Sequence, residues 1–132
     1  MTRYAIDASV ALRLITEGVT VSDEHQLVAP NLLRSQALSQ IYRSVRSGEL
    51  TDKQGAALLD GVATMRIRLL GDRVSRATAY RIAKQLDWDD TDRAEYVAVA
   101  QLQADAFVTL DDDLAAAVEG IVTIAPYEAL LD

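Results

Sequence analysis

Short runs of uniformly apolar residues alternate with longer stretches in which apolar residues recur every three or four positions. Continuous apolar runs are typical of strands buried on both faces, and the longer spacing is typical of amphipathic helices. We expect strands at residues 4–6, 27–29, 67–70, 106–110 and 121–124. We expect helices from Ser9 to about residue 15 and at residues 32–46, 52–64, 72–86, 93–103, 114–118 and 127–131.

Two of the expected helices have recognisable start signals. Asn31 precedes the helix at residues 32–46, in which Leu38 belongs to the expected apolar stripe, and asparagine is a favoured N-cap residue. Thr51 and Gln54 have the spacing of a capping box, in which each side chain bonds the backbone N–H of the other residue.

The alternation of strands and helices predicts the class of fold. Strands joined through helices favour a parallel sheet that is covered by helices on both faces. We therefore predict an α/β fold: a single three-layer α/β/α domain over residues 1–132 with a mostly parallel central sheet.

Composition narrows the possible functions. The chain has no cysteine and one histidine, which excludes a disulfide framework and metal sites rich in thiolate or imidazole. The net charge of −7 argues against a broad basic surface that follows a phosphate backbone. We find neither an apolar run long enough to span a membrane nor a signal peptide, so we expect a cytoplasmic protein.

Two expected strands end in an aspartate, Asp7 and Asp111. If these strands are neighbours in a parallel sheet, the two carboxylates converge at one edge, where such sheets place their ligands. Converging carboxylates favour a divalent cation, and Mg²⁺ commonly takes one or two protein carboxylates plus water. Asp113 could assist through a water molecule. The alternative is that Asp7 and Asp111 only cap the helices that follow them.

The order of several short motifs resembles one known family. The motifs are Ile6-Asp7-Ala8-Ser9, Ala29-Pro30 before the helix at residues 32–46, Gly48-Glu49-Leu50, Ala94-Glu95-Tyr96-Val97-Ala98 and Val108-Thr109-Leu110-Asp111. Together they resemble the PIN-domain ribonucleases, specifically the VapC-type toxins of bacterial toxin–antitoxin pairs. The resemblance implies an endoribonuclease that cuts RNA with a water molecule activated by Mg²⁺ or Mn²⁺. It also implies a homodimer that is held inactive by a cognate antitoxin.

The family's four acidic positions fall on Asp7, Gln36, Arg93 and Asp111 of this chain, so two expected carboxylates are replaced. Gln36 still offers a neutral carbonyl oxygen, whereas Arg93 brings a positive charge. In one hypothesis the first turn of the helix is rewound by about 100°, so that Asp92 faces inward as the third ligand. In a second, Arg93 itself holds a phosphate bidentately. In a third, Arg93 only forms a surface ion pair with Asp89, four positions earlier.

Three further residues are weak candidates for substrate binding: Ser9, Arg34 and Arg43. No histidine is near Ser9 in the expected fold to activate it, so its hydroxyl is better suited to capping or support than to nucleophilic attack. The two arginines lie on the helix at residues 32–46 and could meet phosphates, although a solvated helix face is the simpler interpretation.

These observations leave three functional hypotheses. The first is an Mg²⁺-dependent endoribonuclease with Asp7, Asp111 and Asp92 as catalytic residues and Asp7, Asp111 and Asp113 around the metal. The second is a degenerate PIN scaffold that binds protein or RNA without catalysis. The third is a phosphatase with Asp7 as its nucleophile, but such enzymes generally have a second acid two residues later, where this chain has Ser9.

Overall fold

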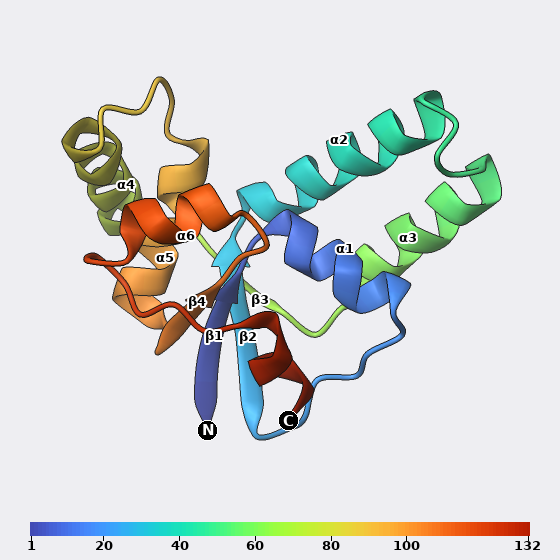
Figure 1. Ribbon diagram of the computed structural model, residues 1–132, viewed down its shortest axis with the longest axis horizontal. Coiled ribbons are helices and arrows are strands. Elements are labelled where there is room, and N and C mark those ends of the chain that lie inside the picture. Colours follow the sequence, from blue (N-terminus) through green and yellow to red (C-terminus); the bar gives the residue numbers. More distant parts are fainter.

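The central element is a four-stranded sheet whose strands all run parallel, in the order β3-β2-β1-β4 (Figure 1). The computed structural model describes all 132 residues. Its strands are β1 (Thr2–Ile6), β2 (His25–Pro30), β3 (Arg68–Leu70) and β4 (Ala106–Val108). The predicted fold class is therefore confirmed, with a sheet that is entirely parallel.

Six α-helices and one 3₁₀ helix surround this sheet (Figure 1). They are α1 (Ala8–Thr16), α2 (Leu32–Arg46), α3 (Asp52–Thr64), α4 (Arg73–Gln85), α5 (Asp92–Gln103), α6 (Asp112–Val118) and η1 (Tyr127–Leu131). Helix α5 packs on β1, β2 and β4, and α4 packs on α5. Figure 1 shows α4 and α5 on one side of the sheet, and α1, α2 and α3 on the other. None of these helices has both the length and the apolar character needed to cross a bilayer.

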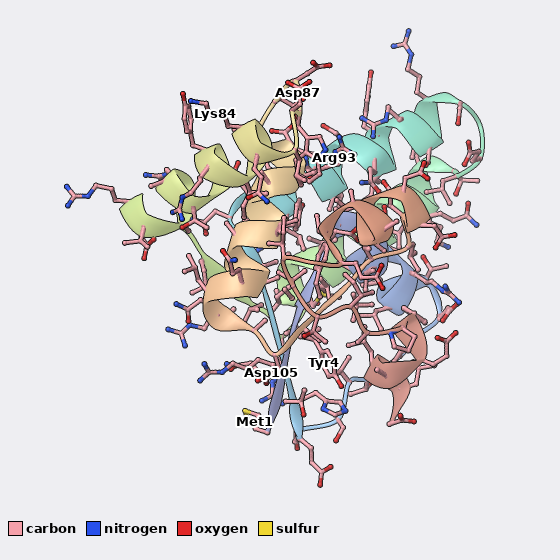
Figure 2. All side chains as sticks on the ribbon, turned by 60° about the vertical axis from the view of Figure 1, so that its left-hand side comes forward. Met1, Tyr4, Lys84, Asp87, Arg93 and Asp105 are labelled. Carbon is pink, nitrogen blue, oxygen red and sulfur yellow. The ribbon has the colours of Figure 1, made fainter.

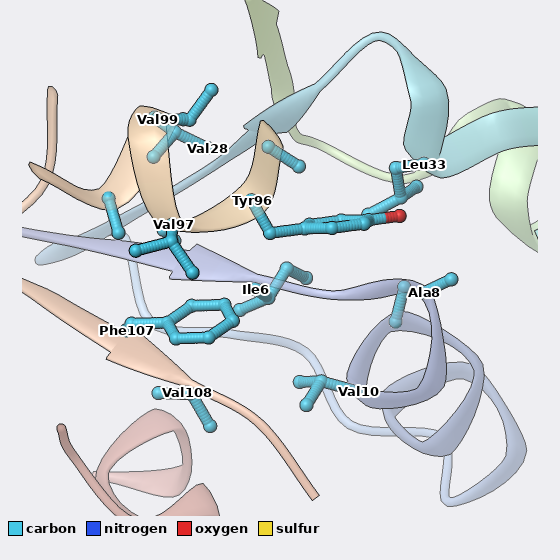
Figure 3. Close-up of a cluster of buried hydrophobic side chains, with 14 of the residues drawn as sticks. Ile6, Ala8, Val10, Val28, Leu33, Tyr96, Val97, Val99, Phe107 and Val108 are labelled. Atoms are coloured by element: carbon cyan, nitrogen blue, oxygen red, sulfur yellow. The ribbon is translucent and has the colours of Figure 1, made fainter. Parts of the chain in front are cut away.

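The core is built from the continuous apolar runs that predicted the strands. Ile6, Phe107 and Val108 are fully buried, and Val97 and Val99 of α5 pack against the sheet from one side (Figure 3). Because α5 is apolar on several sides, it can contact the sheet and α4 at the same time.

Strand register determines where the site residues lie. Tyr4 of β1 is paired with Leu27 of β2 and with Ala106 of β4, and Ile6 is paired with Val108. The residues that follow β1 and β4 therefore leave the sheet side by side at its carboxyl edge.

Of the two expected helix-start signals, one is formed and one is not. Thr51 and Gln54 form the capping box, because the Thr51 hydroxyl accepts from the Gln54 N–H at 3.1 Å and the Gln54 side chain accepts from the Thr51 N–H at 2.9 Å. The expected side-chain cap at Asn31 is not formed. Asn31 already has helical backbone angles, whereas an N-cap side chain reaches back from an extended conformation.

Two predictions from the apolar pattern are wrong. Leu38 is 52% exposed, because the buried stripe of α2 runs through Leu33, Ala37 and Ile41 instead. The strand expected at residues 121–124 is reduced to a single bridge between Phe107 and Ile124. The backbone N–H groups of Ile121 and Val122 bond to the carbonyl of Val118 in a turn after α6, so they are not available to a strand.

Candidate functional site

A cavity of about 250 Å³ opens at the carboxyl edge of the sheet, between the starts of α1, α5 and α6 and the first half of α2. Its polar lining comes from Asp7, Ser9, Gln36, Gln40, Arg93, Tyr96 and Asp111. Both aspartates that were predicted from strand ends therefore lie in one cavity, together with Gln36 and Arg93, the two positions at which the sequence resemblance expects carboxylates.

Asp7 is the most buried acid of this cavity, and both of its carboxylate oxygens are engaged. Oδ1 accepts a hydrogen bond from the Val10 N–H at 3.0 Å and so caps α1. Oδ2 accepts from the Thr109 hydroxyl at 2.5 Å. Burial raises the pKa of Asp7 above its ordinary value, the hydrogen bonds from Thr109 and Val10 lower it, and the negative charge of Asp111 raises it again. The net result is a raised pKa, because removing the carboxylate from water disfavours its charged form.

Thr109 connects the two aspartates. Its hydroxyl donates to Asp7 and accepts from the Asp111 N–H at 3.1 Å. Sequence reasoning did not include Thr109 among the site residues. The available signal was one hydroxyl residue interrupting the apolar run of the fourth expected strand, two positions before the aspartate.

Asp111 is more exposed than Asp7, and one of its oxygens stays free. Oδ1 accepts from the Leu114 N–H at 3.0 Å and caps α6. No protein group donates to Oδ2 within hydrogen-bond distance. The capping role considered for both aspartates is therefore real, and it coexists with their shared position in the cavity.

A second polar layer joins α2 to α1 and α5. The Tyr96 hydroxyl donates to Gln36 Oε1 at 2.6 Å, and the Ser9 hydroxyl donates to Gln40 Oε1 at 3.3 Å. Burial, followed by the negative charge of Asp7, raises the pKa of Tyr96 well above its ordinary value, so this phenol stays neutral and keeps its proton. Figure 3 shows the Tyr96 hydroxyl extending beyond the end of β1 toward Ala8.

Arg93, and not Asp92, lines the cavity. Its guanidinium carbon lies 4.5 Å from the centre of the Trp88 ring, a cation–π contact. The inward turn of Asp92, one of the three hypotheses for this helix start, is not observed. Helix α5 begins at Asp92, one residue earlier than predicted, and the Asp92 side chain is exposed and does not line the cavity. The ion pair between Asp89 and Arg93, another of these hypotheses, is also absent. The molecule's two ion pairs join Arg13 to Glu17 and Arg66 to Asp23.

The remaining predicted residues lie outside the cavity. Asp113, Arg34 and Arg43 are exposed on α6 and α2, and none of them contributes to the cavity lining. Figure 2 shows Arg93 at the same end of the molecule as Lys84 and Asp87, opposite Met1 and Asp105.

The donor set can be compared with the requirements of a divalent metal. The molecule has no cluster of three or more acidic or histidine side chains that could ligate a metal ion. Asp7 and Asp111 nevertheless repel each other in one cavity, and Asp111 has a free oxygen. Mg²⁺ often uses one or two carboxylates and takes its other ligands from water and substrate phosphates. The residues therefore fit a magnesium ion that is shared with a phosphate, and they do not form an all-protein cage.

The fold and cavity together define a class of protein: a three-layer α/β protein with a paired-carboxylate site at the carboxyl edge of a parallel sheet. The fold is similar to the crystal structure of PAE2754 from Pyrobaculum aerophilum, with a TM-score of 0.76 and 23% sequence identity over 98% of this chain and 93% of that chain. At this level of identity the similarity establishes the fold. No family model and no curated protein matches the sequence.

Proposed function

We propose that the protein is a metal-dependent endoribonuclease of the VapC type, which binds an RNA phosphodiester in the cavity beside Asp7 and Asp111. The observation that carries this proposal is the convergence of two carboxylates and one unpaired guanidinium in a single cavity. A phosphodiester with a divalent cation needs both kinds of charge, since the cation is attracted by carboxylates and the phosphate by an arginine.

Each cavity residue has a distinct role in this proposal. Asp7 and Asp111 would hold Mg²⁺ or Mn²⁺, and Thr109 fixes the orientation of Asp7 through its hydroxyl hydrogen bond. Arg93 would bind a phosphate oxygen, with its guanidinium supported by the Trp88 ring. A bound metal ion would supply activation of a water molecule and neutralisation of phosphate charge.

Tyr96 and Gln36 are best placed as supports in the same proposal. Their 2.6 Å hydrogen bond holds the Gln36 carbonyl oxygen, which leaves that oxygen one remaining lone pair. Gln36 therefore supplies at most a weak neutral contact to an ion, and the two aspartates carry the binding.

A second candidate function is RNA or protein binding without hydrolysis. The specific observation in its favour is that Arg93 lines the cavity at the position where the resemblance expects a carboxylate. A positive charge there weakens metal affinity while it favours a phosphate, so binding can persist after catalysis is lost.

Cleavage of single-stranded RNA separates these two functions. We expect slow, Mg²⁺- or Mn²⁺-dependent cleavage by the natural chain, and a loss of about 100-fold or more in Asp111→Ala because the free carboxylate oxygen is removed. The matched control is Asp112→Asn, which changes the neighbouring exposed carboxylate outside the cavity. Equal cleavage by the natural chain and Asp111→Ala, with or without metal, would contradict the enzymatic proposal.

The expected partners belong to the same proposal. The family resemblance suggests a homodimer in the cytoplasm and a cognate antitoxin, whose basic segment would suit an acidic protein. A measured mass near twice 14.4 kDa in solution would support the dimer, and a mass near 14.4 kDa at working concentration would contradict it.

A further inference from the structure

Positive charge is concentrated in one segment of this acidic protein. Residues 65–86 contain six of the 13 basic residues and one of the 20 acidic residues, a net charge of +5. The rest of the chain then has seven basic and 19 acidic residues, a net charge of −12. Such an asymmetry directs an anionic partner toward one side of the molecule.

Most of this charge lies on the exposed face of α4. The helix has no acidic residue between its ends and four exposed basic residues: Arg73, Arg76, Arg81 and Lys84. Its buried side is formed by Thr78, Ala79, Ile82 and Ala83, which pack toward α5. At 100° per residue Arg73, Arg81 and Lys84 project within about 50° of the direction opposite this buried side. Arg76 projects about 90° from that direction, at the edge of the exposed face. Figure 2 shows Lys84 pointing outward from α4.

None of these four cations forms an ion pair, although Arg76 lies near enough to Asp72 and Glu95 for its positive charge to favour their ionised forms. The two ion pairs of the molecule join Arg13 to Glu17 and Arg66 to Asp23, and neither involves α4. Tyr80 lies among the four cations and is 67% exposed, so its ring is available for stacking. Unpaired cations interleaved with an exposed aromatic ring are the combination that binds single-stranded nucleic acid without reading its sequence.

We propose that the exposed face of α4, defined by Arg73, Arg76, Tyr80, Arg81 and Lys84, binds a stretch of single-stranded RNA. This proposal rests on the proposed function, since it assigns a binding surface for the same substrate class. The acidic connector with Asp87, Asp89 and Asp90 leads from α4 to the start of α5 and disfavours a phosphate path directly along it. The α4 face is therefore a surface separate from the cavity. It would hold one part of the RNA while the phosphodiester bond to be cut lies in the cavity.

The test is the salt dependence of RNA binding, measured by fluorescence anisotropy of a labelled single-stranded oligoribonucleotide in the presence of EDTA. The variant Arg73→Ala/Lys84→Ala removes two cations and preserves the helix, because alanine has the highest helix propensity. We expect at least tenfold weaker binding at low salt and a decrease of about 1.4 in the slope of log affinity against log salt. Tyr80→Ala should weaken binding about fivefold or more and leave that slope unchanged.

The matched control is Arg46→Ala/Lys53→Ala, which changes the net charge equally at the far end of the α2–α3 hairpin (Figure 1). We expect its affinity to stay within about threefold of the natural chain. Equal weakening by the two double variants would overturn the proposal, because binding would then follow net charge alone. An acidic peptide whose binding is weakened by Arg73→Ala/Lys84→Ala, while RNA binding is unchanged by that variant, would also overturn the proposal and assign the face to a protein partner.

A small substrate separates this proposal from the proposed function. Bis(p-nitrophenyl) phosphate is too short to reach from the cavity to α4, so its metal-dependent hydrolysis reports on the cavity alone. Hydrolysis of this substrate can be absent while Arg73→Ala/Lys84→Ala binds RNA more weakly and with a smaller slope of log affinity against log salt. In that case the enzymatic proposal fails and the α4 proposal is supported. The opposite pattern refutes the α4 surface and supports the cavity.

Discussion

Asp7 combines a structural task with the chemistry proposed for it. Its carboxylate caps α1 through Val10 and is held by Thr109, yet burial and Asp111 both raise its pKa. The hydrogen bonds fix its geometry while its charge remains unfavourable in the absence of a cation. If the proposed cation binds beside Asp7, this carboxylate gives up stability in the free protein for binding.

Replacing this charge tests that interpretation. Asp7→Asn keeps an N-cap of equal quality and removes the buried charge, so we expect the variant to be more stable at pH 7 without metal by about 1 kcal/mol, or roughly 3–4 °C in Tm. Thermal unfolding followed by circular dichroism measures the difference. A variant less stable than the natural chain under these conditions would contradict the interpretation.

The difference in stability between Asp7→Asn and the natural chain should change with pH in a defined direction. The pKa of Asp7 in the folded protein is raised above 3.8, so the folded state binds this proton more tightly than the unfolded state. Asp7 therefore makes its most favourable contribution to the free energy of unfolding below about pH 3.8, where it is protonated. That contribution falls as the pH rises through the raised pKa of Asp7. The advantage of Asp7→Asn should grow with pH over this window and then level off, as denaturant unfolding at several pH values would show. A constant difference would exclude the titration of Asp7 as the cause.

Arg93 can be tested by restoring the charge that the resemblance expects. Arg93→Asp changes the charge at an exposed position by two units, and after solvent screening we expect about 1.4 kcal/mol, or tenfold tighter binding of Mn²⁺. Calorimetric titration measures the affinity, and Arg34→Asp is the control for the same charge change outside the cavity. An equal gain in both variants would show that Arg93 has no special position relative to the metal.

Only part of the site was visible in the sequence. Asp7 and Asp111 could be predicted because each ends an apolar run, and parallel strands end at a common edge. Gln40 has no sequence signal, and Thr109 has only the weak signal of a hydroxyl that interrupts an apolar run. The roles of both residues depend on how α2 and β4 approach the end of β1. The direction of Arg93 depends on the start of α5, and a shift of one residue there exchanges Asp92 for Arg93.

At the scale of elements, helices with local start signals were the most predictable. The capping box of α3 is encoded by two residues three positions apart, and the structure forms both of its hydrogen bonds. The strand expected at residues 121–124 had only its apolar character in its favour. Its backbone was already bonded to the end of α6, a tertiary outcome that the pattern cannot show.

The contrast between two helix starts gives a prediction at this scale. Thr51→Ala removes a formed cap and should cost about 1 kcal/mol, or roughly 3–4 °C in Tm. Asn31→Ala removes a side chain that makes no capping bond and should cost less than about 0.5 kcal/mol. Thermal unfolding of both variants checks the order, and a larger loss for Asn31→Ala would contradict the observed caps.

At the scale of the whole molecule, the parallel sheet brings together residues that are far apart in the sequence. Asp7 and Thr109 are 102 positions apart and share a hydrogen bond, because β1 and β4 are neighbours. The fold class could be predicted from the alternation of apolar runs and helices. The uneven distribution of charge along the chain is visible in the sequence. The position of the α4 cations on one exposed face depends on how α4 packs on α5, which the sequence pattern does not show.

The central claim is that Asp7 and Asp111 form a weak divalent-metal site that a phosphate completes. The most direct measurement is calorimetric titration of Mn²⁺ into the natural chain and into Asp111→Ala, with and without a non-cleavable 2′-O-methyl oligoribonucleotide. We predict millimolar binding by the natural chain that becomes at least tenfold tighter with the oligonucleotide, and no comparable binding by Asp111→Ala. Binding that is absent from the natural chain, or identical in the two proteins, would contradict the claim.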